Sequence, residues 1–155
     1  MFERYPEPSV RALFVAKAAA LAVGAQSIDV EHLLVGAVAS WPDAGIRRDE
    51  IVRGVGLSMP SELPGPGSPE IPFSGVVQRV LNSAMALADR FGQHRIRPEH
   101  LLLALLDDSH SVASEILQQA AVEREELLRS AAEGALSDDG PLQYRSRLEI
   151  KARSQ

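Results

Sequence analysis

The sequence contains no cysteine at all. This absence excludes disulfide cross-links, thiolate catalysis and cysteine-ligated metal sites, and it is typical of a protein in a reducing compartment. Aromatic residues make up only 5% of the chain. The core therefore has to be built from leucine, valine, isoleucine and alanine, a composition that favours closely packed helices.

Long apolar runs and basic stretches are missing as well. The first ten residues are charged and are interrupted by Pro6 and Pro8, unlike a signal peptide. The apolar stretch at residues 13–25 includes Lys17 and is too short to span a bilayer. A net charge of -5 argues against nucleic acid as a main partner. We therefore predict a cytoplasmic monomer that binds neither membranes nor nucleic acids.

What the sequence does have is an internal repeat. The segment GAQSIDVEHLLVGAV, residues 24–38, returns 68 residues later as GQHRIRPEHLLLALL, residues 92–106. The shared Gly, Ile and Glu-His-Leu-Leu fall at identical offsets without a gap. A duplicated helical unit is usually a surface that holds a partner rather than a catalytic site. We therefore expect neither enzymatic activity nor a cofactor.

The spacing of apolar residues predicts an all-α fold of two pseudo-symmetric four-helix repeats. Gly24 and Gly92 are expected to end the first helix of each repeat, and the second helices begin near Asp29 and Arg97. The remaining predicted helices lie at residues 47–55, 112–120 and 124–134.

The first repeat lacks a good fourth helix, because prolines crowd the segment that follows residue 59. This gives a first repeat at residues 1–57, a Pro/Gly-rich linker at 58–72 and a second repeat at 73–136, the two repeats forming one compact domain. Residues 137–155 are expected to be a poorly ordered charged tail.

The repeated histidines, His32 and His100, are the first candidates for chemistry. Each follows a glutamate directly, so the two side chains point about 100° apart on a helix, whereas zinc requires ligands three or four residues apart. We therefore expect no metal site. The histidines are expected to orient the starts of their helices through local hydrogen bonds.

The repeated glutamates, Glu31 and Glu99, lie in the first turn of a helix, where free N–H groups favour a negative charge. Two interpretations stay open: stabilisation of the helix end alone, or a carboxylate at the mouth of a shallow pocket that accepts a guanidinium from a partner. The second interpretation requires both helix starts to face solvent. Phe2 and Phe73 precede the first helix of each repeat, either as additional core or as the rim of a peptide-binding groove.

Residues 1–135 resemble the N-terminal domain of Clp/Hsp100 chaperones, a double Clp-N repeat, through the motifs VEHLLVGAV and PEHLLLALL. The resemblance implies an all-α domain that binds substrate or adaptor proteins for an ATPase ring. In ClpC-like members it implies that glutamates at the Glu31 and Glu99 positions accept phosphoarginine. A hydroxyl near the start of the long helix assists, and the corresponding residue is Ser74 in the second repeat but Pro6 in the first.

No ATPase motif occurs in the chain, which is therefore interpreted either as a piece of a longer chaperone or as a free-standing domain. The resulting hypothesis is a non-catalytic module of the Clp chaperone-protease system that binds substrates, adaptors or a Clp ATPase, with arginine or phosphoarginine as ligands. The alternative is a decoy that sequesters a small molecule or peptide, and an enzyme with a His/Glu site is the weakest reading. The candidate binding residues are Glu31, Glu99, Ser74, Phe2, Phe73, His32 and His100.

Overall fold

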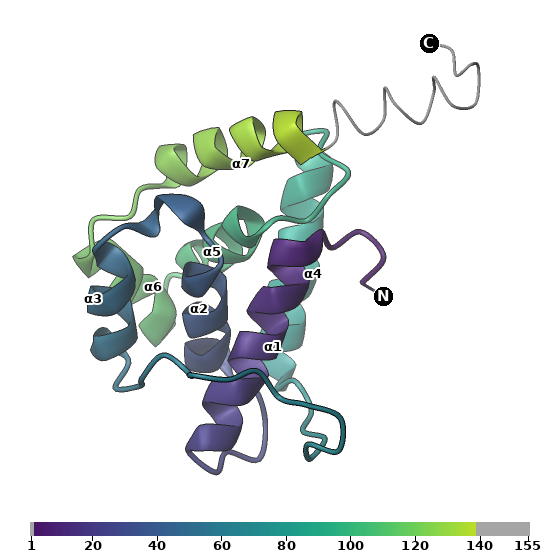
Figure 1. Cartoon of the computed structure of the whole chain (residues 1–155). Coiled ribbons are helices and arrows are strands. Elements are labelled where there is room, and N and C mark those ends of the chain that lie inside the picture. Colours follow the sequence, from purple (N-terminus) through teal and green to yellow (C-terminus); the bar gives the residue numbers. More distant parts are fainter. Residues whose placement is uncertain (1, 139–155) are drawn as a thin grey trace.

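The computed structural model describes residues 2–138, and within them the chain is helical throughout its regular elements (Figure 1). Over this part of the chain there is no strand, and an isolated bridge pairs Ile28 with Phe73. The predicted all-α fold is confirmed. The elements are α1 (Glu7–Ala22), α2 (Val30–Ala39), the 3-10 turn η1 (Pro42–Ala44), α3 (Arg47–Gly54), α4 (Gly75–Arg90), α5 (Pro98–Asp107), α6 (Val112–Gln119) and α7 (Arg124–Asp138).

The internal repeat is reproduced in helix lengths. Helices α1, α2 and α3 have 16, 10 and 8 residues, and α4, α5 and α6 have the same lengths in the same order. Helix α7 has no counterpart, because residues 55–74 of the first half contain no helix. Helix α7 continues to Asp138, so residues 137 and 138 of the predicted tail are helical. The rest of that tail lies outside the described residues.

Local sequence signals explain where the helices start and stop. Gly24 and Gly92 have φ of 69° and 68°, the left-handed conformation that a glycine adopts just beyond a helix end. Asp29 caps α2 through its carboxylate, which accepts a hydrogen bond from the Val30 amide at 2.9 Å. Pro98 occupies the first position of α5, where its missing N–H leaves no bond unmade.

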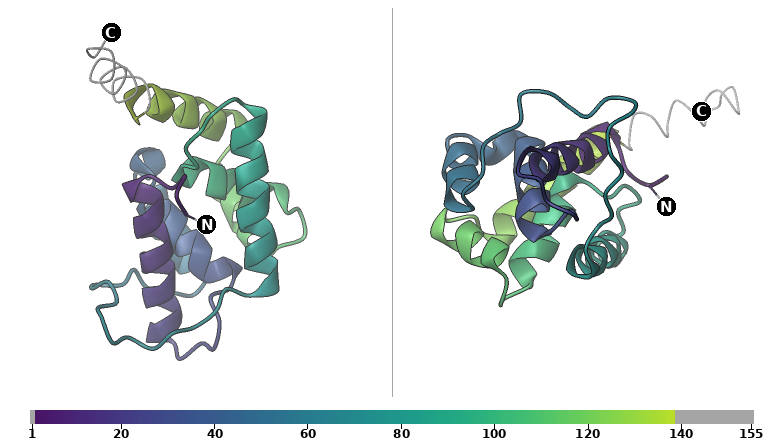
Figure 2. Two further views of the ribbon diagram at one scale, coloured as in Figure 1. Left: turned by 90° about the vertical axis from the view of Figure 1, so that its right-hand side faces the viewer. Right: turned by 90° about the horizontal axis from the view of Figure 1, so that it is seen from below.

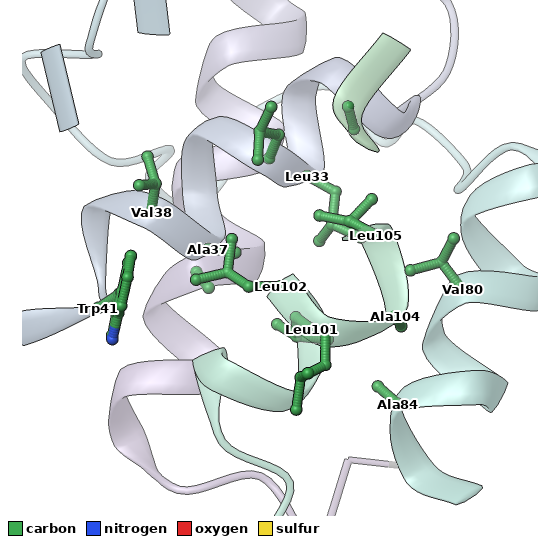
Figure 3. Close-up of a cluster of buried hydrophobic side chains, with 14 of the residues drawn as sticks. Leu33, Ala37, Val38, Trp41, Val80, Ala84, Leu101, Leu102, Ala104 and Leu105 are labelled. Carbon is green, nitrogen blue, oxygen red and sulfur yellow. The ribbon is translucent and has the colours of Figure 1, made fainter. Parts of the chain in front are cut away.

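Helices α2 and α5 form the centre of the molecule, and α1 and α4 stand on either side of them (Figure 2). The central pair reads VEHLLVGAVA and PEHLLLALLD, apolar on nearly every side, which is the pattern of a fully buried helix. Leu33 and Ala37 of α2 face Leu102 and Leu105 of α5 (Figure 3). The two halves therefore share one continuous core and are not two separate bundles.

One glycine allows α1 and α2 to pack more closely than α4 and α5 do. A Cβ on Gly36 of α2 would overlap the carbonyl oxygen of Ala12 and lie 3.1 Å from the amide nitrogen of Ala16, both in the backbone of α1. Ala104 occupies the equivalent position of α5. In agreement, the contact between α1 and α2 is more extensive than that between α4 and α5.

Candidate functional site

The loop that precedes each central helix pairs with the other half of the chain. The Ile28 amide donates to the Pro72 carbonyl at 2.8 Å, and the Ile96 amide donates to the Arg4 carbonyl at 2.9 Å. These two bonds occupy equivalent positions of the repeat. The loops thus cross over, so the residues before α4 lie beside the start of α2, and the residues before α1 lie beside the loop that leads into α5.

Proline breaks the symmetry of this crossing. The Ser74 amide donates to the Ile28 carbonyl at 2.9 Å, whereas Pro6, at the equivalent position, has no N–H to give. The buried Ser9 hydroxyl instead donates to the Ile96 carbonyl at 2.6 Å. The carbonyl in the second crossing is therefore satisfied by a side chain.

Ser74, the N-cap of α4, lies beside Asp29, the N-cap of α2 in the other half of the chain. Its hydroxyl accepts from the Val77 amide at 3.1 Å, which caps α4, and donates to the Asp29 carboxylate at 3.2 Å. The hydrogen-bond partners of this serine in the first half are Asp29 and Ile28, because the loops exchange partners between halves. Pro6 correspondingly lies on the α5 side.

Glu31 is half-buried in the first turn of α2. Among the residues that the structure describes, its carboxylate has no hydrogen bond or ion pair. A carboxylate at the positive end of a helix, without a cation from the described residues, is suited to accept one from outside.

The histidines accept hydrogen bonds from backbone amides at the starts of α2 and α5, as the sequence predicts. The Asp29 amide donates to His32 Nδ1 at 2.9 Å, and the Arg97 amide donates to His100 Nδ1 at 2.8 Å. Because Nδ1 of His100 accepts a hydrogen bond, it carries no proton, and the ring proton is on Nε2, which donates a hydrogen bond to the Gln93 side-chain oxygen at 2.6 Å. Burial, followed by the positive charges of nearby arginines, lowers the pKa of His100 to about 4. His100 is therefore a neutral structural residue.

Glu99 is enclosed, with 1% of its surface exposed. Its Oε2 accepts from the Ser130 hydroxyl of α7 at 2.7 Å, and its Oε1 lies 3.4 Å from Nε of Arg97. The expectation that both repeated carboxylates face solvent is therefore wrong for Glu99. The physical reason is α7, which packs on α5 in the second half and has no equivalent over α2 in the described part of the chain.

Ser130, in the middle of α7, connects this helix to the first half through hydrogen bonds. The indole N–H of Trp41 donates to its hydroxyl oxygen at 3.1 Å, and the Asp43 carboxylate lies 3.0 Å from the same oxygen. Since a hydroxyl has one proton, Ser130 donates to Glu99 or to Asp43 but not to both at once. Nearby, Arg47 forms two hydrogen bonds to Glu126 of α7, at 2.9 and 2.6 Å.

Sequence reasoning missed this cluster. Two signals pointed to it: Trp41 is the only tryptophan of the chain, and Arg97 stands where the first repeat has Asp29. A charge reversal between equivalent positions of a repeat indicates that the two copies have different contacts or roles at that position.

Phe2 and Phe73 meet at the edge of the α1 surface. Both are half-buried, and their ring centroids are 6.2 Å apart at an interplanar angle of 70°. Together with Ile28 they line an apolar pocket of about 240 Å³. The other residues around it are Val10, Leu13, Phe14, Lys17, Glu70 and Ile71. The two aromatics are thus both peripheral core and pocket wall.

Other kinds of site find no support in the described residues. Within residues 2–138 no cluster of three or more histidine, aspartate or glutamate side chains is arranged to hold a metal ion. None of the helices in that range is both long enough and apolar enough to cross a membrane.

The chain is similar to known proteins over most of its length. A family model described as the Clp repeat (R) N-terminal domain matches residues 72–150, half of the chain. The rice chaperone protein ClpD2, chloroplastic, is 28% identical over 90% of this chain, and rice ClpD1 is 35% identical over 70% of it. The chain spans 16% and 13% of the length of these two relatives.

Two solved structures share the fold. The N-terminal domain of ClpD from Arabidopsis thaliana superposes with a TM-score of 0.65 at 24% identity, covering 86% of this chain and 95% of that one. A chain solved in a study of a malarial protein secretion system superposes with a TM-score of 0.67 at 17% identity, covering 89% of this chain and 99% of its own. At these identities the likeness concerns the fold.

Proposed function

This chain belongs to the family of Clp repeat N-terminal domains, and we propose on that premise that it binds segments of substrate or adaptor proteins at the start of α2. Domains of this family are interaction modules without catalytic function. A working partnership with a Clp ATPase, the monomeric state, the division into repeats at 1–57 and 73–136, and the cytoplasmic location belong to the same proposal.

One observation supports arginine as the recognised group. In the second half, the carboxylate of Glu99 pairs with a guanidinium, that of Arg97. Glu31 is the equivalent carboxylate of the first half, and there Asp29 replaces the arginine. The internal symmetry thus indicates which group complements Glu31, and no residue in the described part of the chain supplies that group.

The apolar pocket adjoins the hydrogen-bonded pair of Asp29 and Ser74 at the start of α2. Ile28 and Phe73 line the pocket, and each is followed directly by a residue of the polar site, Asp29 or Ser74. The volume of about 240 Å³ is below the range of about 300 to 1,000 Å³ that is typical for drug-sized ligands. The pocket therefore suits one or two apolar side chains, and we expect a peptide in which an arginine is flanked by leucine or phenylalanine.

Binding of a fluorescent Leu-Arg-Phe-containing peptide to the purified chain tests the proposal. Glu31→Gln removes one charge-assisted pair, worth about 1.5 to 3 kcal/mol, so we expect the affinity to fall roughly 10- to 100-fold. Glu115→Gln is the matched control, because Glu115 is an exposed carboxylate in the first turn of α6. Circular dichroism checks that helicity is unchanged. Full binding by Glu31→Lys would contradict the proposal.

The same measurement decides between arginine and phosphoarginine. A phosphoryl group would meet the negative charges of Asp29 and Glu31 and has the Ser74 hydroxyl as a nearby donor. We therefore expect the unmodified peptide to bind at least as tightly as its phosphoarginine form. Tighter binding of the phosphorylated peptide, lost in Ser74→Ala, would assign the modified residue as the ligand.

The apolar pocket also supports a second candidate, a decoy that sequesters an apolar small molecule or peptide. On this reading Phe73→Ala abolishes binding of the apolar ligand, and Glu31→Lys leaves it unchanged. Dependence on both residues favours the arginine-containing peptide.

A further inference from the structure

Arg97 is a surface-type residue in an unusual place. It precedes α5, yet only 7% of it is exposed, and its guanidinium lies between Glu99 and the backbone of α7. Gly134 of α7 makes this position possible, because a Cβ there would overlap the guanidinium carbon of Arg97. Helix α7 thus leaves space for a planar cation directly above a buried carboxylate.

The two halves differ at this point in three linked ways. The second half has Arg97, the covering helix α7 and a carboxylate that is shielded from solvent. The first half has Asp29, no covering helix in the described residues, and Glu31 half-exposed. The Glu99 site of the second half therefore corresponds to the Glu31 site of the first half with a guanidinium bound.

We propose that Arg97 is an internal ligand, which fills the guanidinium site of the second half and leaves Glu31 as the open member of the repeated pair Glu31 and Glu99. This inference rests on the proposed function for the meaning of the open site. The pairing of Arg97 with Glu99 does not depend on the proposed function, because both groups belong to the chain. Arg97 then determines how many guanidinium groups the chain can bind. Without the Arg97 side chain, Glu99 accepts a guanidinium from outside.

The test is chemical rescue in the full chain. Arg97→Ala removes the side chain and leaves a cavity of guanidinium shape beside Glu99, and Glu31→Gln is added so that the open site does not contribute. Ethylguanidinium at millimolar concentration is the probe, and the thermal midpoint is the measurement. We expect a saturable rise in the midpoint of Arg97→Ala/Glu31→Gln that is absent in Glu31→Gln alone. Ethylammonium, which lacks the planar fork, is expected to give a smaller rise.

Adding Glu99→Gln provides the matched control, because it removes the carboxylate and keeps the cavity. The triple variant is expected to lose the saturable response. If Arg97→Ala/Glu31→Gln responds to ethylguanidinium no more than Glu31→Gln does, the inference is overturned. The same holds if the response persists in the triple variant.

Arg97→Ala leaves a buried carboxylate without its cation, which destabilises the fold strongly. If the variant does not fold alone, it is refolded with and without ethylguanidinium. Recovery of helical circular dichroism only with the probe supports the inference, and no recovery in either condition contradicts it.

The two proposals fail separately. If Glu31→Gln leaves peptide binding intact while Arg97→Ala gains a Glu99-dependent response, the peptide site at α2 is wrong and the internal ligand stands. If Glu31→Gln abolishes peptide binding while Arg97→Ala gains nothing, the reverse holds.

Discussion

The close approach of α1 to α2 gives the sharpest test of the fold. In Gly36→Ala, the new Cβ would overlap the Ala12 carbonyl oxygen and lie 2.9 Å from the Ala12 carbonyl carbon. Both atoms belong to the α1 backbone, so no side-chain rotation relieves the overlap and the whole helix has to shift. Overpacking of this kind costs about 1 to 3 kcal/mol, and a backbone clash belongs at the upper end.

The higher helix propensity of alanine offsets about 1 kcal/mol of that cost. We therefore expect Gly36→Ala to lower the free energy of unfolding by about 2 kcal/mol, which corresponds to about 4 to 8 °C in Tm for a chain of this size. Urea denaturation followed by circular dichroism at 222 nm measures the change. The expected result is a lower midpoint with an unchanged m-value.

Two controls isolate the clash. Ala104→Gly, at the equivalent position of α5, is expected to cost about 2 kcal/mol, from helix propensity and from the loss of a buried methyl group, without any clash. Gly65→Ala meets no atom within 4 Å and is expected to cost nothing. If Gly36→Ala is as stable as the native chain, the packing argument for the first half is refuted.

Three further predictions concern polar groups that are buried or partly buried. Burial lowers the pKa of His100 to about 4 from 6.5. As the pH falls, His100 therefore becomes protonated in the unfolded chain before it does in the folded chain. Stability is then complete above pH 6.5 and falls by about 3 kcal/mol as the pH drops to 4; urea midpoints at pH 7 and pH 4.5 measure this, and His100→Gln should reduce the slope. Trp41→Phe removes the hydrogen bond to Ser130 and shrinks a fully buried side chain, so it is expected to lower the free energy of unfolding by about 2 to 3 kcal/mol, with no loss contradicting the bond. Arg47→Met breaks the pair with Glu126, whose side chains are 23% and 26% exposed, and should cost about 1 kcal/mol or less, with the difference shrinking in 1 M NaCl.

The sequence was sufficient for the helical architecture. The repeated Glu-His-Leu-Leu motif located both central helices, Asp29 located the start of α2, and Gly24 and Gly92 located the ends of α1 and α4, because these signals act within one turn of the chain. The prolines before residue 73 likewise excluded a fourth helix in the first half by local geometry alone. Even the role of the histidines followed from their position in the first turn.

The site was less accessible to such reasoning because it depends on contacts between distant segments. Glu31 and Glu99 have nearly identical local sequences, and only the docking of α7 distinguishes them. Ser74 reaches Asp29 because the loops exchange partners between the halves, a fact that no pattern within one repeat encodes. Residue Arg97 was treated as a helix start, whereas its side chain turns inward only because Gly134 leaves room for it.

The most direct test of the account is the mapping of an arginine-containing peptide onto the chain by two-dimensional NMR of the backbone amides. The account predicts that the largest chemical-shift changes fall on residues 28–33 and 73–75, and that Glu31→Lys abolishes them. Changes centred on α5 and α7, or changes that survive Glu31→Lys, would contradict the claim that the start of α2 is the open binding site.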